Sequence, residues 1–180
     1  MYQKVIVFIA VIFAFSGCQD RDETYANPPQ EVLQYVERLL PAAEQYVRDN
    51  EAEALEKGVP LNANQLMMAA RIGLKSPEKV RVYYADKLPF PDDPELAALA
   101  KKYGYSSPLT GAYTYGYGLW IKRSEKGNQE LLAHELIHVR QAEQMGIREQ
   151  TKQYLLQLFI YGYRDAPMEL EAYREASQYL

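Results

Sequence analysis

Cysteine and histidine are both scarce in this sequence of 180 residues, which contains one cysteine and two histidines. A single cysteine excludes a disulfide scaffold and a zinc site made of four thiolates. Glycine and proline number ten each, with no recurring period, which excludes collagen-like and repeat architectures. Positive charge is not in excess, because 20 Lys and Arg stand against 24 Asp and Glu. The sequence therefore argues against nucleic acid as a partner, since phosphate binding needs clustered basic residues.

The length and the hydrophobic content are those of one ordinary domain. Hydrophobic residues make up 48% of the chain, which is enough for a sizeable core. Tyrosine is unusually frequent, with 16 Tyr against five Phe and one Trp. Because a tyrosine ring is apolar and its hydroxyl is polar, we expect a core whose rim meets water.

The first 17 residues have the features of a secretory signal. Lys4 precedes an unbroken apolar run over residues 5–15, which is too short to span a bilayer. The pair Ser16-Gly17 directly before Cys18 resembles a bacterial lipoprotein signal. This resemblance implies cleavage after residue 17 and a lipid on Cys18. A plain signal peptide with a bystander cysteine and an N-terminal membrane anchor are the alternatives.

Residues 18–30 are predicted to be the lipidated cysteine and a flexible tether, followed by one domain over 31–180. The segment after Cys18 is polar and contains two prolines, a composition typical of linkers. Gln19, rather than Asp, follows the cysteine, which in Gram-negative lipoproteins favours the outer membrane. We therefore expect a protein of the bacterial cell envelope, attached to the membrane by its lipid.

Hydrophobic spacing and capping residues predict a mostly helical α+β fold with a small sheet ahead of a central helix. Asn62 and Gln65 have capping-box spacing, and Asp93-Pro94 is a good start for a helix. Alternation of side chains predicts strands over 79–85 and 112–122. Helices are predicted over 32–47 with a kink or restart at Pro41, and over 63–72, 94–104, 129–145, 149–161 and 168–180.

The motif H-E-x-x-H at residues 134–138 carries the chemistry. On a helix, His134 and His138 lie one above the other and can bind one zinc ion together. Glu135 lies beside them and can accept a proton from water as a general base. Apolar residues surround the motif, so the helix is expected to be buried. The alternative is a pair of core histidines whose ring nitrogens are satisfied by neighbouring tyrosines.

The third metal ligand is expected to be a carboxylate, because the chain has no further histidine or cysteine to offer. Glu169 and Glu171 both lie near the start of a predicted helix. They point about 200° apart, so only one of them can face the metal. A carboxylate in a first helical turn also complements the helix dipole, which would explain the glutamate that is not the ligand.

The sequence resembles the gluzincin-type zinc metallopeptidases, in which H-E-x-x-H is followed by a glutamate ligand on a later helix. TYGYGLWIK at 114–122 and LLAHELIHVRQ at 131–141 are similar to small bacterial proteins with minimal gluzincin-like cores. The resemblance implies a zincin-like core, Zn²⁺ as the cofactor and Glu169 as the third ligand. In those peptidases an acidic residue usually follows on the helix that carries the glutamate ligand, and Tyr173 stands at that position here. The resemblance also implies that the strand before the active-site helix is an edge along which a substrate binds.

The resemblance implies a zinc-dependent peptidase that hydrolyses peptide or protein substrates in the envelope. One alternative is a zinc-stabilised lipoprotein that binds a protein partner and has no catalytic activity. Another is hydrolysis of a non-peptide amide, such as a cell-wall linkage. Stabilisation of the oxyanion would need a hydrogen-bond donor, and four tyrosines are near enough in sequence. These candidates are Tyr154, Tyr161, Tyr163 and Tyr173.

Overall fold

The computed structural model describes residues 21–105 and 110–180. The predicted signal peptide, Cys18 and the beginning of the predicted tether lie outside these residues. Among the helices of the described part of the chain, none is long and apolar enough to cross a membrane.

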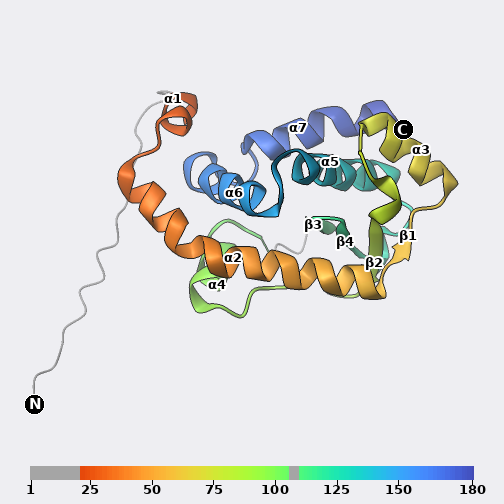
Figure 1. Cartoon of the computed structure of the whole chain (residues 1–180), viewed down its shortest axis with the longest axis horizontal. Coiled ribbons are helices and arrows are strands. Elements are labelled where there is room, and N and C mark those ends of the chain that lie inside the picture. Colours follow the sequence, from red (N-terminus) through yellow and green to blue (C-terminus); the bar gives the residue numbers. More distant parts are fainter. Residues whose placement is uncertain (1–20, 106–109) are drawn as a thin grey trace, which may run out of the picture.

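The described residues form an α+β fold that is mostly helical, as the sequence predicts (Figure 1). Its mixed sheet has the order β1 (Val59–Pro60), β2 (Arg81–Ala85), β4 (Gly118–Lys122), β3 (Ala112–Tyr115). Strands β2 and β4 are parallel, and the other two pairs are antiparallel. The α-helices are α1 (Arg21–Ala26), α2 (Gln30–Lys57), α3 (Ala63–Ile72), α4 (Pro94–Lys102), α5 (Gln129–Met145), α6 (Ile147–Tyr161) and α7 (Pro167–Ala176). Short 3-10 turns cover Pro77–Lys79, Arg123–Glu125 and Ser177–Tyr179.

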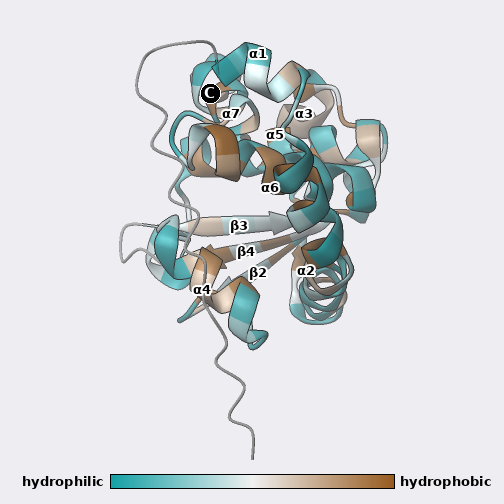
Figure 2. Ribbon diagram, turned by 90° about the vertical axis from the view of Figure 1, so that its left-hand side faces the viewer, coloured by the Kyte–Doolittle hydropathy of each residue, from teal (hydrophilic) through white to brown (hydrophobic). Residues whose placement is uncertain are grey.

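The sheet has a helical layer on each face, and side-chain alternation explains why. Leu119 and Ile121 of β4 point to one face, where they join a core cluster with Ile137 of α5. Trp120 points to the opposite face, towards Ala54 of α2. Figure 2 shows apolar residues where these elements face one another. Helix α5, which carries the H-E-x-x-H motif, is thus held directly against the sheet.

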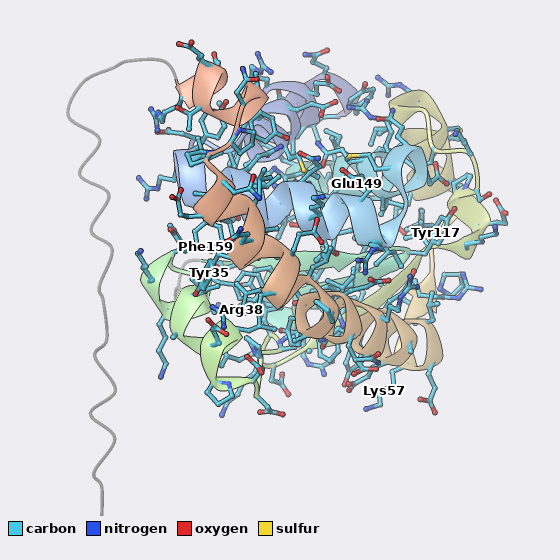
Figure 3. The ribbon with its side chains drawn as sticks, turned by 60° about the vertical axis from the view of Figure 1, so that its left-hand side comes forward. Tyr35, Arg38, Lys57, Tyr117, Glu149 and Phe159 are labelled. Atoms are coloured by element: carbon cyan, nitrogen blue, oxygen red, sulfur yellow. The ribbon has the colours of Figure 1, made fainter. Side chains whose placement is uncertain are left out.

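A second cluster joins α2, α4 and α6 at the edge of the molecule (Figure 3). Tyr35 of α2 makes an edge-to-face contact with Phe159 of α6, with ring centroids 5.1 Å apart. Arg38 lies over the Tyr35 ring and forms two hydrogen bonds, of 2.8 and 2.7 Å, with Glu95 of α4. These contacts fix the helices that form one wall of the cavity described below.

The predicted strand over 112–122 is in fact a hairpin of β3 and β4, with a turn at Gly116 and Tyr117. Gly116 has a φ of +56°, which favours glycine. The Tyr117 N–H donates to the carboxylate of Glu51 at 2.9 Å, and a Cβ at Gly116 would collide with that carboxylate. A residue of α2, far away in the sequence, thus binds the chain at this turn.

The predicted tether also differs from the structure, because residues 21–26 form helix α1 and pack against α6. Arg21 donates to Asp165 at 2.9 Å and to the carbonyl of Tyr161 at 3.1 Å. The hydroxyl of Tyr25 donates to Gln153 of α6 at 2.5 Å. These partners lie more than a hundred residues further along the chain. The predicted restart of a helix at Pro41 is also wrong, because Pro41 lies inside the single helix α2.

Truncation of a core residue is expected to destabilise the whole fold. Leu119 is fully buried in the centre of β4, so Leu119→Ala should lower the free energy of unfolding by about 2–5 kcal/mol. Leu55→Ala, on the exposed face of α2, should change the free energy of unfolding by no more than about 0.5 kcal/mol. Urea denaturation followed by circular dichroism measures both values, and equal losses would contradict this description of the core.

Candidate metal centre

Helix α5 places its two histidines side by side in the interior. Asn128 caps the helix, since its side chain accepts a hydrogen bond from Leu131 N–H at 3.0 Å, and the helix ends before Gly146. One turn separates His134 from His138, and their Nε2 atoms are 3.1 Å apart. Both side chains are buried, with 7% and 9% of their surface exposed.

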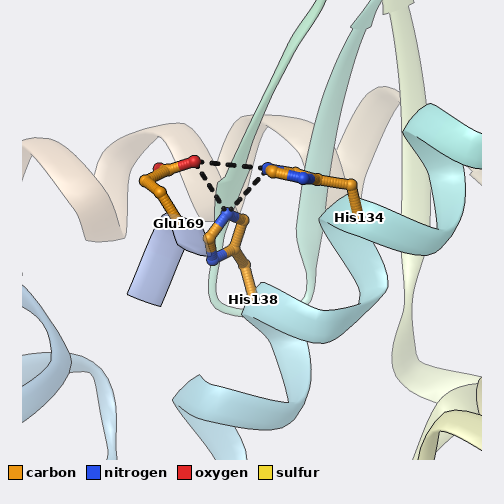
Figure 4. Close-up of side chains that lie close together, drawn as sticks. All are labelled: His134, His138 and Glu169. Carbon is orange, nitrogen blue, oxygen red and sulfur yellow. Dashed lines mark hydrogen bonds and ion pairs between the residues drawn. The ribbon is translucent and has the colours of Figure 1, made fainter. Parts of the chain in front are cut away.

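Helix α7 brings Glu169 to these two imidazoles (Figure 4). Pro167 is the first residue of α7, so Glu169 lies in its first turn, where it is 3% exposed. Its Oε2 atom is 3.3 Å from Nε2 of His134 and 3.6 Å from Nε2 of His138. Glu171 points away, and its carboxylate binds Arg140 at 2.6 Å. Of the two glutamates that the sequence left open, Glu169 is the one beside the histidines.

The geometry of the three residues fits a metal ion. Four-coordinate zinc with bonds of about 2.0–2.1 Å has neighbouring ligand atoms about 3.3–3.4 Å apart. The three distances between the Nε2 atoms and Glu169 Oε2 are 3.1, 3.3 and 3.6 Å. Within the described residues, this buried Oε2 accepts no well-aligned hydrogen bond. A buried carboxylate oxygen without such a partner is costly, and a cation would satisfy it.

The electrostatics of the group agree with this interpretation. Burial lowers the pKa of His138, but the adjacent Glu169 carboxylate more than offsets this and raises it to about 9. Burial raises the pKa of Glu169, yet the charge of His138 and its contact with His134 hold that pKa well below its usual range. The carboxylate is therefore ionised and needs a positive charge beside it. A metal ion that binds here has to displace the proton from His138.

Glu135 lies next to the triad without belonging to it. The carboxylate is 4% exposed, and its Oε2 accepts a hydrogen bond of 2.6 Å from the hydroxyl of Thr114 on β3. The same hydroxyl lies 3.1 Å from the Glu135 carbonyl oxygen. Thr114 thus connects β3 with the H-E-x-x-H motif, and it fixes the orientation of the Glu135 carboxylate.

Three of the four candidate tyrosines lie at the site. The hydroxyl of Tyr154 donates to Glu169 Oε1 at 3.3 Å, and the ring of Tyr173 is 4.5 Å from that of His134. Tyr163 lines the cavities beside the triad. Burial, followed by the Glu169 charge, raises the pKa of all three phenols, so they remain hydrogen-bond donors at neutral pH. Tyr161 instead donates to Asp22 at 2.7 Å, away from the triad.

Two cavities lie beside the H-E-x-x-H motif, and both are lined by His134, Glu135 and Tyr163. The first, of about 160 Å³, is an apolar chamber between α2, α4, α6 and β3. Its walls are aromatic and aliphatic side chains, among them Tyr46, Leu99, Tyr113, Leu155 and Phe159. The second, of about 660 Å³, is more polar and has Lys102, Asn128, Glu130 and Arg164 in its lining. All three residues of the triad line the apolar chamber, whereas His134 alone also lines the polar cavity.

Comparison of the chain with protein-family models, with curated proteins and with solved structures finds no match. Sequence reasoning missed two residues of the site, Thr114 and Gln141, which contact Glu135 and His138. Gln141 could have been found, because it lies three residues after His138 on the same helix face. Thr114 has no comparable signal, since its contact depends on the docking of β3 against α5.

Proposed function

We propose that this protein is a zinc-dependent metallopeptidase of the bacterial cell envelope, with the zincin-like core that its sequence resembles. The observation that carries the proposal is the buried triad of two histidines and one glutamate, with a second carboxylate, Glu135, beside it that is not part of the triad. A structural zinc site needs four protein ligands, whereas three ligands leave one position for water or substrate. The triad offers three, and Glu135 lies where a general base is needed.

The roles follow from the positions of the side chains. His134, His138 and Glu169 would hold the ion through two Nε2 atoms and Oε2. When bound there, zinc supplies Lewis acidity, which lowers the pKa of water and polarises a carbonyl group. Glu135 accepts the proton of the attacking water and delivers it to the leaving amine. The hydrogen bond from Thr114 keeps the Glu135 carboxylate in this position.

Tyr163 is the best placed of the tyrosines to stabilise the oxyanion. It lines both cavities, so a substrate that occupies either cavity would contact its side chain. Tyr154 is already engaged by Glu169, and more than half of the surface of Tyr173 is exposed. A protonated phenol that strengthens its hydrogen bond as charge develops lowers the barrier of the reaction.

The substrate class follows from the sheet edge and the chamber. Strand β3 is the last strand of the sheet and carries Thr114 beside the triad, so an extended peptide can pair with its outer edge. Such pairing uses main-chain hydrogen bonds and tolerates many side chains. The apolar chamber adds a preference for a bulky apolar side chain next to the cleaved bond.

Hydrolysis of fluorogenic peptides tests the proposal. We expect the purified protein to cleave peptides with Phe or Leu beside the scissile bond at least about tenfold faster than the matching Asp peptides. Removal of zinc with a chelator should abolish hydrolysis, and restored zinc should recover it. Cell-wall amide substrates in the same assay test the non-peptide alternative. Stoichiometric zinc without hydrolysis of any substrate would contradict the proposal.

The depth of the triad favours a second candidate function. All three ligands are at most 9% exposed, as is common for structural sites. In this case the ion would stabilise an envelope lipoprotein that binds a protein partner. The lipid anchor on Cys18 belongs to both candidates and is tested by mass spectrometry of the mature N-terminus. Zinc-dependent hydrolysis that is lost in Glu135→Gln would exclude the binding function as the sole role.

A further inference from the structure

Gln141 contacts both helices that carry the triad. It lies one turn after His138 on α5 and is 2% exposed. Its Oε1 atom is 2.8 Å from Nδ1 of His138. Its Nε2 atom donates to the carbonyl of Met168 at 3.1 Å and to Oε2 of Glu171 at 2.7 Å. This side chain therefore has a partner for each of its polar atoms.

These partners determine the orientation of the amide. The Met168 carbonyl and the Glu171 carboxylate only accept hydrogen bonds, so they require the NH₂ group of Gln141. The amide oxygen must then face His138, and because this oxygen only accepts, Nδ1 of His138 must carry the hydrogen. With Nδ1 protonated, the lone pair of a neutral imidazole is on Nε2, the atom that faces His134 and Glu169.

The same amide also fixes the position of α7. Met168 directly precedes Glu169 in the chain. The backbone N–H of Met168 donates to Oε1 of the buried Gln157 at 3.0 Å. Glu171 is held in turn by Arg140, at 2.6 Å, which also binds Glu175 at 2.8 Å. Arg140 and Gln141 are neighbours on α5, so α5 binds α7 on both sides of the Glu169 side chain.

We propose that Gln141 is a positioning residue of the metal centre, which selects the Nε2-binding tautomer of His138 and aligns Glu169 through Met168 and Glu171. The sequence lacks an acidic residue at Tyr173, where the resemblance places one. Gln141, oriented by Glu171, provides a hydrogen-bond acceptor for His138 in a different way. The proposal rests on the metal site of the proposed function but not on hydrolysis.

Zinc affinity, measured by competition with a chromophoric chelator, tests the proposal. Gln141→Leu should bind zinc about 10–100-fold more weakly than wild type, the usual effect of losing a partner of a metal-bound histidine. Gln144→Leu is the matched control, since Gln144 lies on the exposed face of the same helix. Equal affinities of Gln141→Leu and wild type would overturn the proposal. Circular dichroism verifies that each variant is folded.

A spectroscopic signature separates positioning from general stability. The chain has two histidines, so long-range ¹H–¹⁵N spectra of the zinc-loaded protein contain only two imidazoles. We expect a hydrogen-bonded Nδ1–H on His138 in wild type, identified by its loss in His138→Ala. In Gln141→Leu this proton should move upfield or exchange too fast to be seen. An unchanged Nδ1–H signal would show that Gln141 is not its acceptor.

Two further variants keep the test decisive if Gln141→Leu does not fold. Glu171 has 35% of its side chain exposed, so Glu171→Leu should fold, and it should weaken zinc binding because Gln141 loses its strongest partner. In Gln141→Glu alone, two carboxylates face each other at positions 141 and 171. The double variant Gln141→Glu/Glu171→Gln keeps an acceptor for Nδ1 and restores a hydrogen bond between these two positions, so it should bind zinc more tightly than Gln141→Glu alone. Wild-type affinity in Glu171→Leu would contradict the proposal. Absence of zinc binding in wild type would overturn the metal site as well, whereas zinc binding without hydrolysis would remove only the peptidase.

Discussion

Replacement of Glu135 by glutamine is expected to abolish hydrolysis while leaving the metal site intact. The amide has nearly the shape of the carboxylate and can still accept the hydrogen bond from Thr114, but it cannot accept a proton from water. General-base catalysis contributes about 10²–10⁴-fold, so kcat should fall by at least about 100-fold. Because Glu135 is not a ligand of the triad, zinc affinity should change little.

The measurement combines kinetics with metal analysis of the same samples. Steady-state assays on the best fluorogenic peptide give kcat and KM, and elemental analysis gives the zinc content. Glu149→Gln is the matched control, because Glu149 is an exposed carboxylate of α6 that lines neither cavity. A Glu135→Gln protein with full zinc and wild-type kcat would refute the assigned mechanism. Loss of zinc together with activity would instead make Glu135 part of the binding site.

The local elements of the fold could be predicted from the sequence because short-range chemistry determines them. Helix α5 spans the predicted residues, Asn62 and Gln65 form the predicted capping box, and Asp93 caps α4 as expected. These features depend on side chains within three or four residues of one another.

The features that sequence reasoning missed depend on distant contacts. The hairpin turn at Gly116 is set by Glu51, and α1 forms because Tyr25 and Arg21 find partners near the other end of the chain. The resemblance implied Glu169 as the third ligand, but the spacing of the residues left Glu169 and Glu171 open for the same reason. Helical geometry shows only that one of them faces the histidines, whereas Arg140 and Gln141 of α5 bind Glu171 and thereby determine which one.

Removal of the Glu169 carboxylate is expected to eliminate zinc binding at working concentrations. It is the only carboxylate of the described residues grouped with the two histidines, so Glu169→Ala leaves two ligands for the ion. Loss of a residue that only hydrogen-bonds to a metal ligand already lowers metal affinity by about 10–100-fold. Loss of a ligand itself should therefore lower zinc affinity by at least about 100-fold.

Thermal unfolding measures this loss without any substrate. Free zinc at 100 times the wild-type Kd should stabilise wild type by about 2.7 kcal/mol, which raises Tm by about 5–10 °C in a domain of this size. Glu169→Ala should show a rise of no more than about 1–2 °C at the same concentration, since its Kd would then be close to the zinc concentration. Glu149→Ala, which removes an exposed carboxylate of α6 that lines neither cavity, should keep the wild-type shift. A larger loss in Glu171→Ala than in Glu169→Ala would reverse the assignment of the third ligand, and with it the orientation of α7 on which the metal centre depends.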